Sequence, residues 1–513
     1  METIGVWISK LNNSLSRVHK ATLLGTLVCA IISHGYFMVN DFIYFDSTDI
    51  TGIGQTFDLG RWALALWGKT CGALLGNVQL PLFSSLLAIV FIAISATIVV
   101  SVFDIQSQTT AFFVGAIMVV FPVVTSTFGF LFTAPAYFAA LLLATISAGI
   151  IAKEQNVFRM LISAVVLAFA TGIYQAYFPA AVTILLLLTM VEFLNGKDFE
   201  SVIKKAFWYV GSLGLGLVFY FVFNKIMLLI FGVSMSSYQG ADTMGQINFA
   251  TFPSQIADAY KEYIKGNWQG INEPILLKIL FFITVFMLIT LVVMKIVINK
   301  ISVINVVMVA VLLLLLPVAT NLVYLMINPE ESWVHGLMVY PCCFTFVFIA
   351  KLVDGVSFNK KSVYSIFAVV ASLVLWFTTV CYIFENNKAY LRMSIIQEQL
   401  TSFYTVLITR IETLPGYREN MYVVFEGRPM DEMFAAPTGL DDVSIYEFDF
   451  KKRVMTNSSS WRIYMRLHNG YEFIDVSPEE RELILSSPEF EEMNYYPSDD
   501  SIRIIRDAVV VKF

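Results

Sequence analysis

Residues 40–62 read NDFIYFDSTDITGIGQTFDLGRW, and the rest of the chain is arranged around this stretch. It follows the first long apolar segment directly and is too polar to cross a membrane itself. It contains four aspartates and closes on a Gly-Arg-Trp sequence, namely Asp41, Asp46, Asp49, Asp58 and Gly60-Arg61-Trp62. Several carboxylates and one arginine at a membrane surface indicate acid/base or phosphate chemistry. For each aspartate taken alone, a solvated loop position or a helix cap is the simpler interpretation.

The composition around this stretch is that of a membrane protein with a soluble tail. The 513 residues are 57% hydrophobic and 14% charged, whereas soluble domains carry about 25% charged residues. From Ala21 to Phe384, apolar runs of about twenty residues alternate with short polar loops, which is typical of transmembrane helices. From Glu385 onward the charge density is that of a soluble domain. The net charge of -6 and the lack of a large basic patch argue against a nucleic-acid partner.

We therefore expect an all-α polytopic membrane domain over residues 1–385 and a small α+β domain over residues 386–513. About eleven spans are expected, near residues 21–39, 80–103, 111–124, 134–152, 158–174, 178–194, 206–232, 275–298, 302–326, 337–353 and 362–384. Residues 40–78 and 234–274 are then long loops on one side of the membrane. Within the first loop, RWALALWGKTCGALLG predicts an amphipathic interfacial helix, because Arg61 and Lys69 interrupt its apolar run.

Lysine and arginine set the expected orientation, because they concentrate in cytoplasmic loops. With a cytoplasmic N-terminus, thirteen of them lie in inner loops and span ends, namely Lys10, Arg17, Lys20, Lys153, Arg159, Lys197, Lys204, Lys205, Lys295, Lys300, Lys351, Lys360 and Lys361. The outer loops hold four, namely Arg61, Lys69, Lys261 and Lys265. An odd number of spans then places both the loop 40–78 and the C-terminal domain outside the cytoplasm.

The sequence of the tail, residues 386–513, predicts one helix followed by short strands. A helical pattern covers residues 386–414 and ends at Pro415-Gly416. Strands are expected over residues 421–425, 444–448, 461–467, 471–474 and 502–512, with a hairpin turn at residues 468–470 and a capped helix over residues 476–487. No nucleotide-binding or phosphate-cradling glycine run occurs in this tail.

Two outer turns contain candidates for substrate contacts. Tyr174, Gln175 and Tyr177 lie in a tight turn between two spans, where the alternative for the aromatic residues is an anchoring role at the membrane interface. Trp333 and His335 lie in the last polar turn before the tail.

Lys225 lies inside an otherwise apolar span. A lysine there costs on the order of a few kcal/mol unless it pairs or snorkels, so it either reaches the outer surface or points at a lipid phosphate.

The cysteines and histidines show no CxxC pair and no zinc-ligand spacing, so we expect neither a disulfide framework nor a metal site from them.

The layout resembles the Gtr-type bactoprenol-dependent glucosyltransferases of bacterial surface polysaccharides, which are membrane enzymes of the GT-C class. The features that carry the resemblance are a cytoplasmic start, one span, an external acidic loop ending in Gly60-Arg61-Trp62, about ten further spans and a soluble extracytoplasmic tail. The sequence has no clear counterpart of an arginine-rich external loop near the last spans.

The resemblance implies a bacterial inner-membrane enzyme that uses a sugar linked to undecaprenyl phosphate. The acceptor would be a surface polysaccharide, or a lipid-linked one such as an O-antigen, and a companion donor synthase and flippase would supply the donor. In this class the catalytic carboxylate usually lies in the first external loop, which carries over to Asp41 and Asp46. No cofactor is expected, although two nearby aspartates could hold a divalent ion.

The chemistry of such a transfer assigns roles to the candidates. A base must deprotonate the acceptor hydroxyl, and we expect Asp41 in this role, with Asp46 orienting the acceptor or exchanging roles with it. Cationic groups must bind the donor phosphate, and we expect Arg61 first, then Lys225, then Lys69. Two other functions fit the same layout: a lipid-linked glycan polymerase or ligase, and a transporter or flippase for a lipid-linked sugar.

Overall fold

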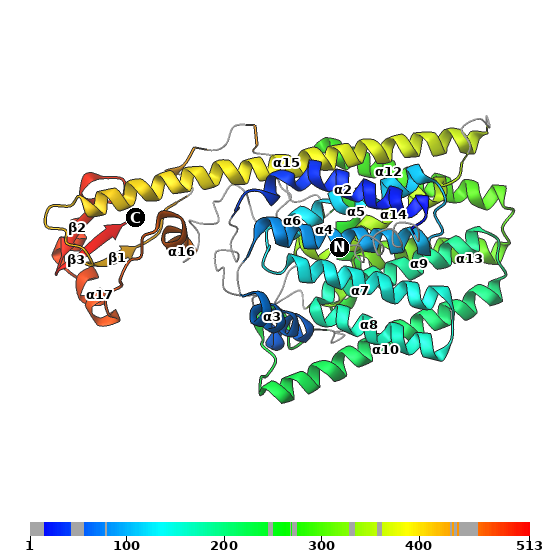
Figure 1. Cartoon of the computed structure of the whole chain (residues 1–513), viewed down its shortest axis with the longest axis horizontal. Helices are drawn as coiled ribbons and strands as arrows, with labels where there is room; N and C mark the ends of the chain where they lie inside the picture. The colour runs from blue at the N-terminus through cyan, green and yellow to red at the C-terminus, as the bar shows by residue number, and fades with distance from the viewer. Residues whose placement is uncertain are drawn as a thin grey trace, which may run out of the picture. The chain divides into compact units, whose positions relative to one another are not determined.

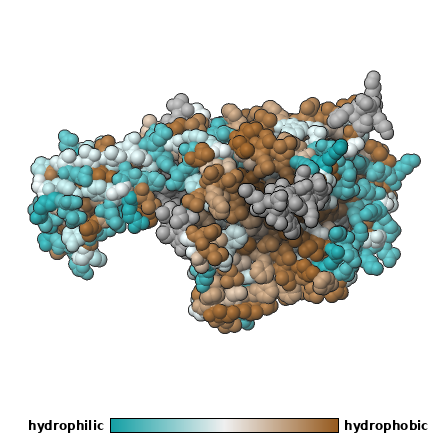
Figure 2. Space-filling model, in the orientation of Figure 1, coloured by the Kyte–Doolittle hydropathy of each residue, from teal (hydrophilic) through white to brown (hydrophobic). Residues whose placement is uncertain are grey.

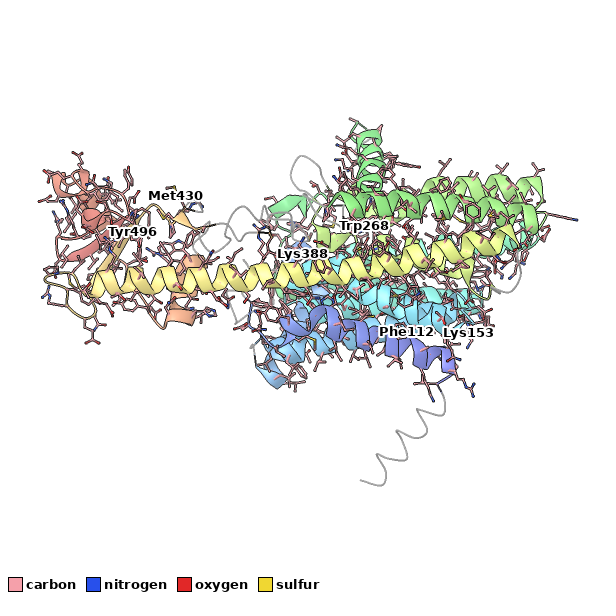
Figure 3. All side chains as sticks on the ribbon, turned by 90° about the horizontal axis from the view of Figure 1, so that it is seen from above. Phe112, Lys153, Trp268, Lys388, Met430 and Tyr496 are labelled. Carbon is pink, nitrogen blue, oxygen red and sulfur yellow. The ribbon has the colours of Figure 1, made fainter. Side chains whose placement is uncertain are left out.

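The computed structural model describes residues 15–42, 56–76, 79–244, 250–266, 268, 274–327, 334–356, 362–430, 433–435, 439–440 and 460–513. The chain divides into two compact units. The first contains residues 1–41, 50–387 and 444–447, and the second contains residues 42–49, 388–443 and 448–513. The division falls inside helix α15 (Val363–Glu412), before Lys388, which Figure 3 labels. The expected boundary at residue 385 lies in the same helix.

The first unit is a bundle of long apolar helices (Figure 1). Nine helical segments among the described residues are long and apolar enough to cross a membrane: α2 (Arg17–Met38), α4 (Pro81–Val102), α5 with α6 (Gln108–Val120, Pro122–Phe128), α7 (Ala134–Lys153), the 3-10 turn η3 with α9 (Gln175–Tyr177, Phe178–Leu194), α10 (Phe199–Phe231), α12 (Ile275–Ile298), α13 (Val303–Thr320) and α15. Two of the eleven expected spans are shorter apolar helices, α8 (Val157–Ile173) and α14 (Cys343–Val353). The predicted class, a helical polytopic membrane protein, is confirmed.

Hydrophobic residues cover the face of this bundle that Figure 2 shows, and hydrophilic residues gather at its right-hand end in that view. We name the ends after two residues. The Arg61 end carries α3 (Trp62–Leu75), α11 (Phe252–Lys265) and the turn between α8 and α9. The Lys351 end carries the turns between α4 and α5, α7 and α8, α9 and α10, and α12 and α13.

The expected span at residues 111–124 is broken into two helices. α5 ends at Val120 and α6 starts at Pro122, because proline has no N–H to continue the helix. Side-chain donors from three other segments bind the freed carbonyl groups: His34 Nε2 to Val119 O at 2.8 Å, Tyr340 Oη to Met118 O at 2.6 Å and Asn386 Nδ2 to Val120 O at 2.8 Å. Irregular backbone at membrane depth is tolerated only when its polar groups are satisfied in this way.

Three serines hold α7, α8 and α10 together. The Ser147 and Ser163 hydroxyl groups each donate to the other residue's carbonyl oxygen at 2.9 Å, and Ser212 donates to Ser163 Oγ at 2.7 Å. Small hydroxyl side chains allow helices in a membrane to approach closely and to bond across the contact. This packing fixes α8 and α10, which carry several residues of the candidate site.

The second unit has a three-stranded sheet in the order β1-β3-β2. β1 (Tyr422–Glu426) runs parallel to β3 (Ala508–Lys512), and β2 (Ile502–Ile505) runs antiparallel to β3. The C-terminal part of α15 and the short helices α16 (Ser460–Tyr464), α17 (Pro478–Leu485) and α18 (Pro488–Glu491) complete the unit. Its core buries apolar side chains of α15, the sheet and α16, among them Leu407, Phe425, Trp461 and Val509.

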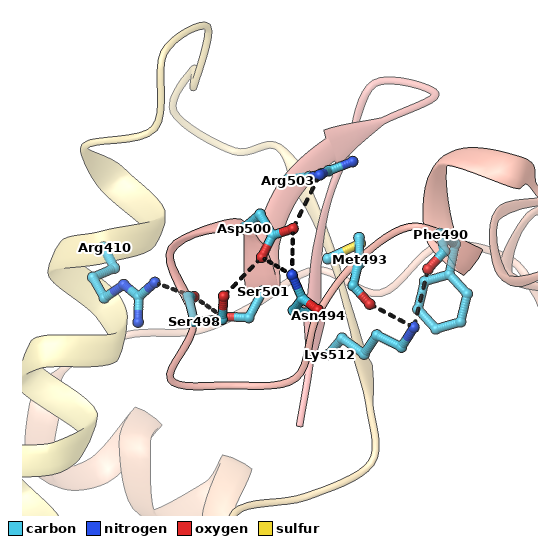
Figure 4. A network of polar contacts seen from close by, with 9 residues as sticks. All are labelled: Arg410, Phe490, Met493, Asn494, Ser498, Asp500, Ser501, Arg503 and Lys512. Carbon is cyan, nitrogen blue, oxygen red and sulfur yellow. Dashed lines mark hydrogen bonds and ion pairs between the residues drawn. The ribbon is translucent and has the colours of Figure 1, made fainter.

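A polar network fixes the segment before β2 to the rest of the second unit (Figure 4). Asp500 accepts hydrogen bonds from Asn494, Ser498 and Arg503. On α15, Arg410 donates to Ser498 O at 2.8 Å. The Lys512 ammonium of β3 donates to the carbonyl groups of Phe490 and Met493, at 3.1 and 2.9 Å.

Several expectations for the tail are wrong. The helix expected to start at residue 386 is the continuation of α15, which begins at Val363. The expected strand at residues 461–467 is helix α16 followed by a π-helical turn, Met465–Asn469. Gly470 ends this turn at φ +69°, and because the segment before it is helical, the expected hairpin does not form there.

The remaining strand predictions have mixed outcomes. The first expected strand corresponds to β1, shifted by one residue. Residues 471–474 form one isolated bridge to the other described residues, between Ile474 and Tyr422. The last expected strand is β2 and β3, separated by Arg506 and Asp507, both at positive φ. The predicted strand at residues 444–448 lies outside the described residues.

Candidate active site

The Gly-Arg-Trp sequence begins at a tight turn before α3. Residues Phe57–Leu59 form a single 3-10 turn, η2, and Gly60 follows it at φ +71°. A Cβ atom on residue 60 would lie 2.5 Å from the Tyr220 hydroxyl oxygen and 3.1 Å from Gln175 Nε2. Both the positive φ and the close approach therefore require glycine at this position.

Gln175 and Tyr220 bind the backbone of this turn. Gln175 Nε2 donates to Leu59 O at 2.8 Å and to the Tyr220 hydroxyl at 3.1 Å, and that hydroxyl donates to Gly60 O at 3.2 Å. Gln175 comes from η3 (Gln175–Tyr177), between α8 and α9, and Tyr220 comes from α10. The two side chains hold Arg61 in place from two different helices.

Trp62 anchors the start of α3 in the bundle. It is 1% exposed and contacts Phe169 and Phe223 edge-on, with ring centroids 5.0 and 5.6 Å apart. A Cβ atom on Gly172 of α8 would lie 2.4 Å from the indole ring, so this glycine makes the room that Trp62 occupies.

Arg61 lies beside a small cavity between these elements. Its guanidinium lies over the Tyr174 ring, 5.0 Å from the centroid, and Tyr174 stacks on Tyr137 at 4.2 Å. The cavity has a volume of about 40 Å³, and Arg61, Tyr174, Gln175 and Tyr238 line it. The rest of its wall is mostly apolar and includes Met244, Met326 and Met338.

Arg61 has no ion-pair partner within the part of the chain that the structure describes, and its buried Nε has no hydrogen-bond partner there. A buried charge without a counter-charge is costly, because the lost hydration is not replaced. The arrangement therefore fits an anionic ligand, and a guanidinium presents a planar fork of donors that suits phosphate.

His335 lies close enough to Arg61 to be affected by its charge. Burial, and then the Arg61 cation, lower the pKa of His335 from 6.5 to about 4. The imidazole is therefore neutral at pH 7 and can both donate and accept hydrogen bonds.

We expect the difference in Tm between the wild type and His335→Gln to be largest above pH 6.5 and to shrink as the pH falls toward 4. In this range the unfolded chain binds a proton at His335 that the folded protein does not bind, so stability is lost on acidification. Thermal unfolding of both full-length proteins in detergent across this range measures the difference. A difference that stays constant with pH would contradict a buried neutral imidazole.

The other predicted residues are placed as follows. Tyr177 is buried and packs against Tyr174, Phe138 and Tyr340. Asp41 is exposed just after the end of α2, while Asp46 and Trp333 lie outside the described residues.

The other two predicted cations do not line the cavity. Lys225 is on the exposed face of α10. The Lys69 ammonium lies over the stacked rings of Phe57 and Phe231, 5.2 and 3.9 Å from their centroids. The structure thus brings together Arg61, Tyr174, Gln175 and His335, whereas Lys225 and Lys69 lie apart from them.

Two residues next to the site, Tyr220 and Tyr137, were not identified from the sequence. Tyr220 precedes Asn224 by one helical turn, and both are buried on the same side of α10, with Gly216 one turn earlier. Two polar residues one helical turn apart in an apolar span, Tyr220 and Asn224, could have indicated from the sequence that this side of α10 faces the protein interior. In the described ranges, no three His, Cys, Asp or Glu residues come together as a metal site would require.

Gly60→Ala should destabilise the protein by about 2–3 kcal/mol, because it adds both a strained φ and a clash with Tyr220. Gly76→Ala is the matched control: Gly76 has φ +81° but nothing within 4 Å of the added Cβ, so it should cost only about 1 kcal/mol. The Tm of each full-length variant in detergent measures the effect. Equal losses for both variants would show that the contact with Tyr220 is not tight.

A family model described as "Glucosyl transferase GtrII" matches residues 35–348. The match covers the described cavity residues of the Arg61 end, and also His335. No curated protein and no solved structure matches this chain.

Proposed function

The chain belongs to the GtrII glucosyl transferase family, and from this premise we propose that it moves a glucosyl residue from undecaprenyl phosphate to a surface polysaccharide at the Arg61 end of the bundle. The observation that carries this proposal is the guanidinium of Arg61, which lines a cavity without a counter-charge among the described residues. A lipid-linked donor has its phosphate at the membrane surface, which is where a group at a helix end can reach it.

The proposed topology places the Arg61 end outside the cytoplasm. Most of the described turns and helix ends at the Lys351 end contain a basic residue, among them Lys153, Arg159, Lys197, Lys300 and Lys351. Such residues concentrate on the cytoplasmic side, which supports a periplasmic or extracellular reaction. Nucleotide sugars are cytoplasmic, so a lipid-linked donor is the form of sugar that fits an external site.

The transfer needs a base and a group that binds the departing phosphate. The acceptor hydroxyl oxygen forms a bond to C1 of the glucosyl residue, the C1–O bond to the donor phosphate breaks, and the electron pair leaves with the phosphate. The hydroxyl proton passes to a carboxylate, for which we propose Asp41, with Asp46 as the second candidate. Arg61 stabilises the charge on the departing phosphate.

The neighbours of Arg61 have supporting roles in this scheme. Gln175 and Tyr220 position the turn that carries Arg61, so we assign Gln175 to positioning. The ring of Tyr174 lines the cavity, and we assign it to contact the sugar or the phosphate; His335 does not line the cavity but lies close enough to Arg61 to be affected by its charge, and we assign it the same role once the cavity has widened. Lys69 and Lys225 lie outside the cavity and could attract the lipid phosphate to the membrane surface before it binds.

The cavity must widen before a donor can bind. About 40 Å³ holds only a few water molecules, which is too little for a sugar phosphate. The segment that follows α10 supplies Tyr238, Ala241 and Met244 to the wall, and its Ser236 N–H binds Asp58 O at 2.9 Å. We propose that this segment moves when the donor enters.

Deletion of the gene tests the function directly. We expect mass spectrometry of the surface polysaccharide to show the loss of one glucosyl branch per repeat, with the chain length unchanged. Shortened or missing chains would instead support a polymerase or ligase. An unchanged glycan together with accumulation of the lipid-linked sugar would support a transporter.

The donor itself must come from a synthase that links glucose to the lipid phosphate and a flippase that moves it across the membrane.

A further inference from the structure

A second group of cations lies at the Lys351 end, far from the cavity along the bundle. Lys351, in the last turn of α14, donates to Asp104 O at 2.7 Å. Lys295, in the last turn of α12, lies over the ring of Tyr364 with its ammonium 5.2 Å from the centroid. Tyr364, near the start of α15, binds Leu352 O through its hydroxyl group. These contacts bring the ends of α12, α14 and α15 together.

The two ammonium groups are close enough for the charge of Lys351 to act on Lys295. Lys295 makes no hydrogen bond or ion pair with any residue that the structure describes. Two like charges side by side, one of them half-buried and without a counter-ion, are unfavourable unless an anion neutralises them.

The nearby carboxylates are already engaged. The two oxygens of Asp354 accept hydrogen bonds from the backbone N–H groups of Gln106 and Ser107, at 2.8 and 3.0 Å. The Asp104 carboxylate accepts from Gln106 Nε2. Neither forms an ion pair with Lys295 or Lys351: Asp354 binds the backbone just before α5, and Asp104 binds the side chain of Gln106.

Apolar side chains continue from this pair along the membrane-facing surface. Val293 and Val297 of α12 and Val363 and Ile366 of α15 are all exposed. A ligand that matches both features has a negative head group at the end of the bundle and acyl chains beside the helices. Basic residues at the cytoplasmic ends of membrane helices bind anionic lipid head groups in this manner.

We propose that Lys295 and Lys351 bind the phosphate of an anionic phospholipid, such as phosphatidylglycerol, in the leaflet at the Lys351 end. Under the topology above, this is the cytoplasmic leaflet. The site is separate from the transfer reaction and does not depend on which sugar or acceptor the protein uses.

The test is retention of defined lipids by the purified full-length protein. We expect native mass spectrometry in detergent to show more bound phosphatidylglycerol than phosphatidylcholine when both are supplied equally. Lys295→Gln should lower the relative retention of phosphatidylglycerol about fivefold, and Lys295→Arg should restore it, because one basic residue near an anionic lipid has an effect of this size. Lys351→Gln should have a similar effect.

Lys153→Gln is the matched control, since Lys153 is an exposed lysine at the end of α7, at the same end of the bundle. It should retain the lipid as the wild type does. Equal retention of the two lipids by the wild type would overturn the proposal, and so would an equal loss in Lys153→Gln and Lys295→Gln. Displacement of the lipid by inorganic phosphate alone would show a site for the free anion and would also contradict a lipid site.

Discussion

Replacing Arg61 by lysine should lower glucosyl transfer by about 100-fold, because a single ammonium cannot reproduce the planar fork of donors around a departing phosphate. The effect should appear in kcat, since charge on the phosphate develops as the glycosidic bond breaks. Membranes from cells expressing each variant, supplied with undecaprenyl-phosphate glucose and polysaccharide from the deletion strain, give the rate. Arg159→Lys is the matched control, because Arg159 pairs with Glu154 at the other end of the bundle and should leave the rate unchanged.

Stability separates a ligand-binding role of Arg61 from a structural one. Without ligand, the buried guanidinium contacts Tyr174 favourably but has no counter-charge among the described residues, and these two effects offset each other. Arg61→Gln should therefore shift the Tm by no more than about 2 °C in detergent. A large loss of Tm would mean that Arg61 holds the turn together, and its effect on transfer could then be explained by misfolding.

Asp41→Asn should reduce transfer by at least about 100-fold, because asparagine keeps the size of the side chain but cannot accept the hydroxyl proton. Asp46→Asn should reduce it less if Asp46 only orients the acceptor. The same membrane assay measures both, with the amount of folded protein determined for each variant.

Asp58→Asn provides the control from the same stretch of sequence, since within the described part of the chain Asp58 is bound through its backbone oxygen, by Ser236 N–H, and not through its carboxylate. It should transfer glucose at close to the wild-type rate. A normal rate in Asp41→Asn with none in Asp46→Asn would exchange the two roles. Normal rates in both would move the base out of this loop.

The helical membrane fold could be predicted because hydrophobic runs of membrane length are a strong signal. The breaks in that pattern were harder to predict. Pro122 marks the break between α5 and α6, but the side chains that make it tolerable, His34, Tyr340 and Asn386, come from distant parts of the chain. The length of α15 was missed because the change in composition at residue 385 was taken as a structural boundary, whereas a helix continues through it.

The error at residues 461–467 has a local cause. Trp461, Ile463, Met465 and Leu467 alternate with polar residues, which favours a strand. The buried residues are Trp461, Tyr464 and Met465, which is helical spacing. A segment this short fits both patterns, and packing against the sheet decides between them.

For the site, Arg61, Tyr174, Gln175 and His335 could be identified from the sequence as candidate residues of three different outer segments. That they lie close to one another could not be predicted. Their proximity depends on the packing of α3 against α8 and α10, where Trp62 fills the space left by Gly172. The role of Gln175 as a support for the turn could not be predicted, because its partners are a backbone oxygen and the hydroxyl of Tyr220 in a distant helix.

The proposed roles of Arg61, Asp41 and Asp46 depend on the transfer of glucose from a lipid phosphate. Reconstitution tests it most directly: purified full-length protein in vesicles is supplied with radiolabelled glucose on undecaprenyl phosphate, or with UDP-glucose, together with surface polysaccharide from a strain that lacks the protein. We expect label in the polysaccharide from the lipid donor, none from UDP-glucose, and a rate about 100-fold lower with Arg61→Lys. Transfer from UDP-glucose without transfer from the lipid donor, or movement of the lipid across the vesicle without any transfer, would contradict it.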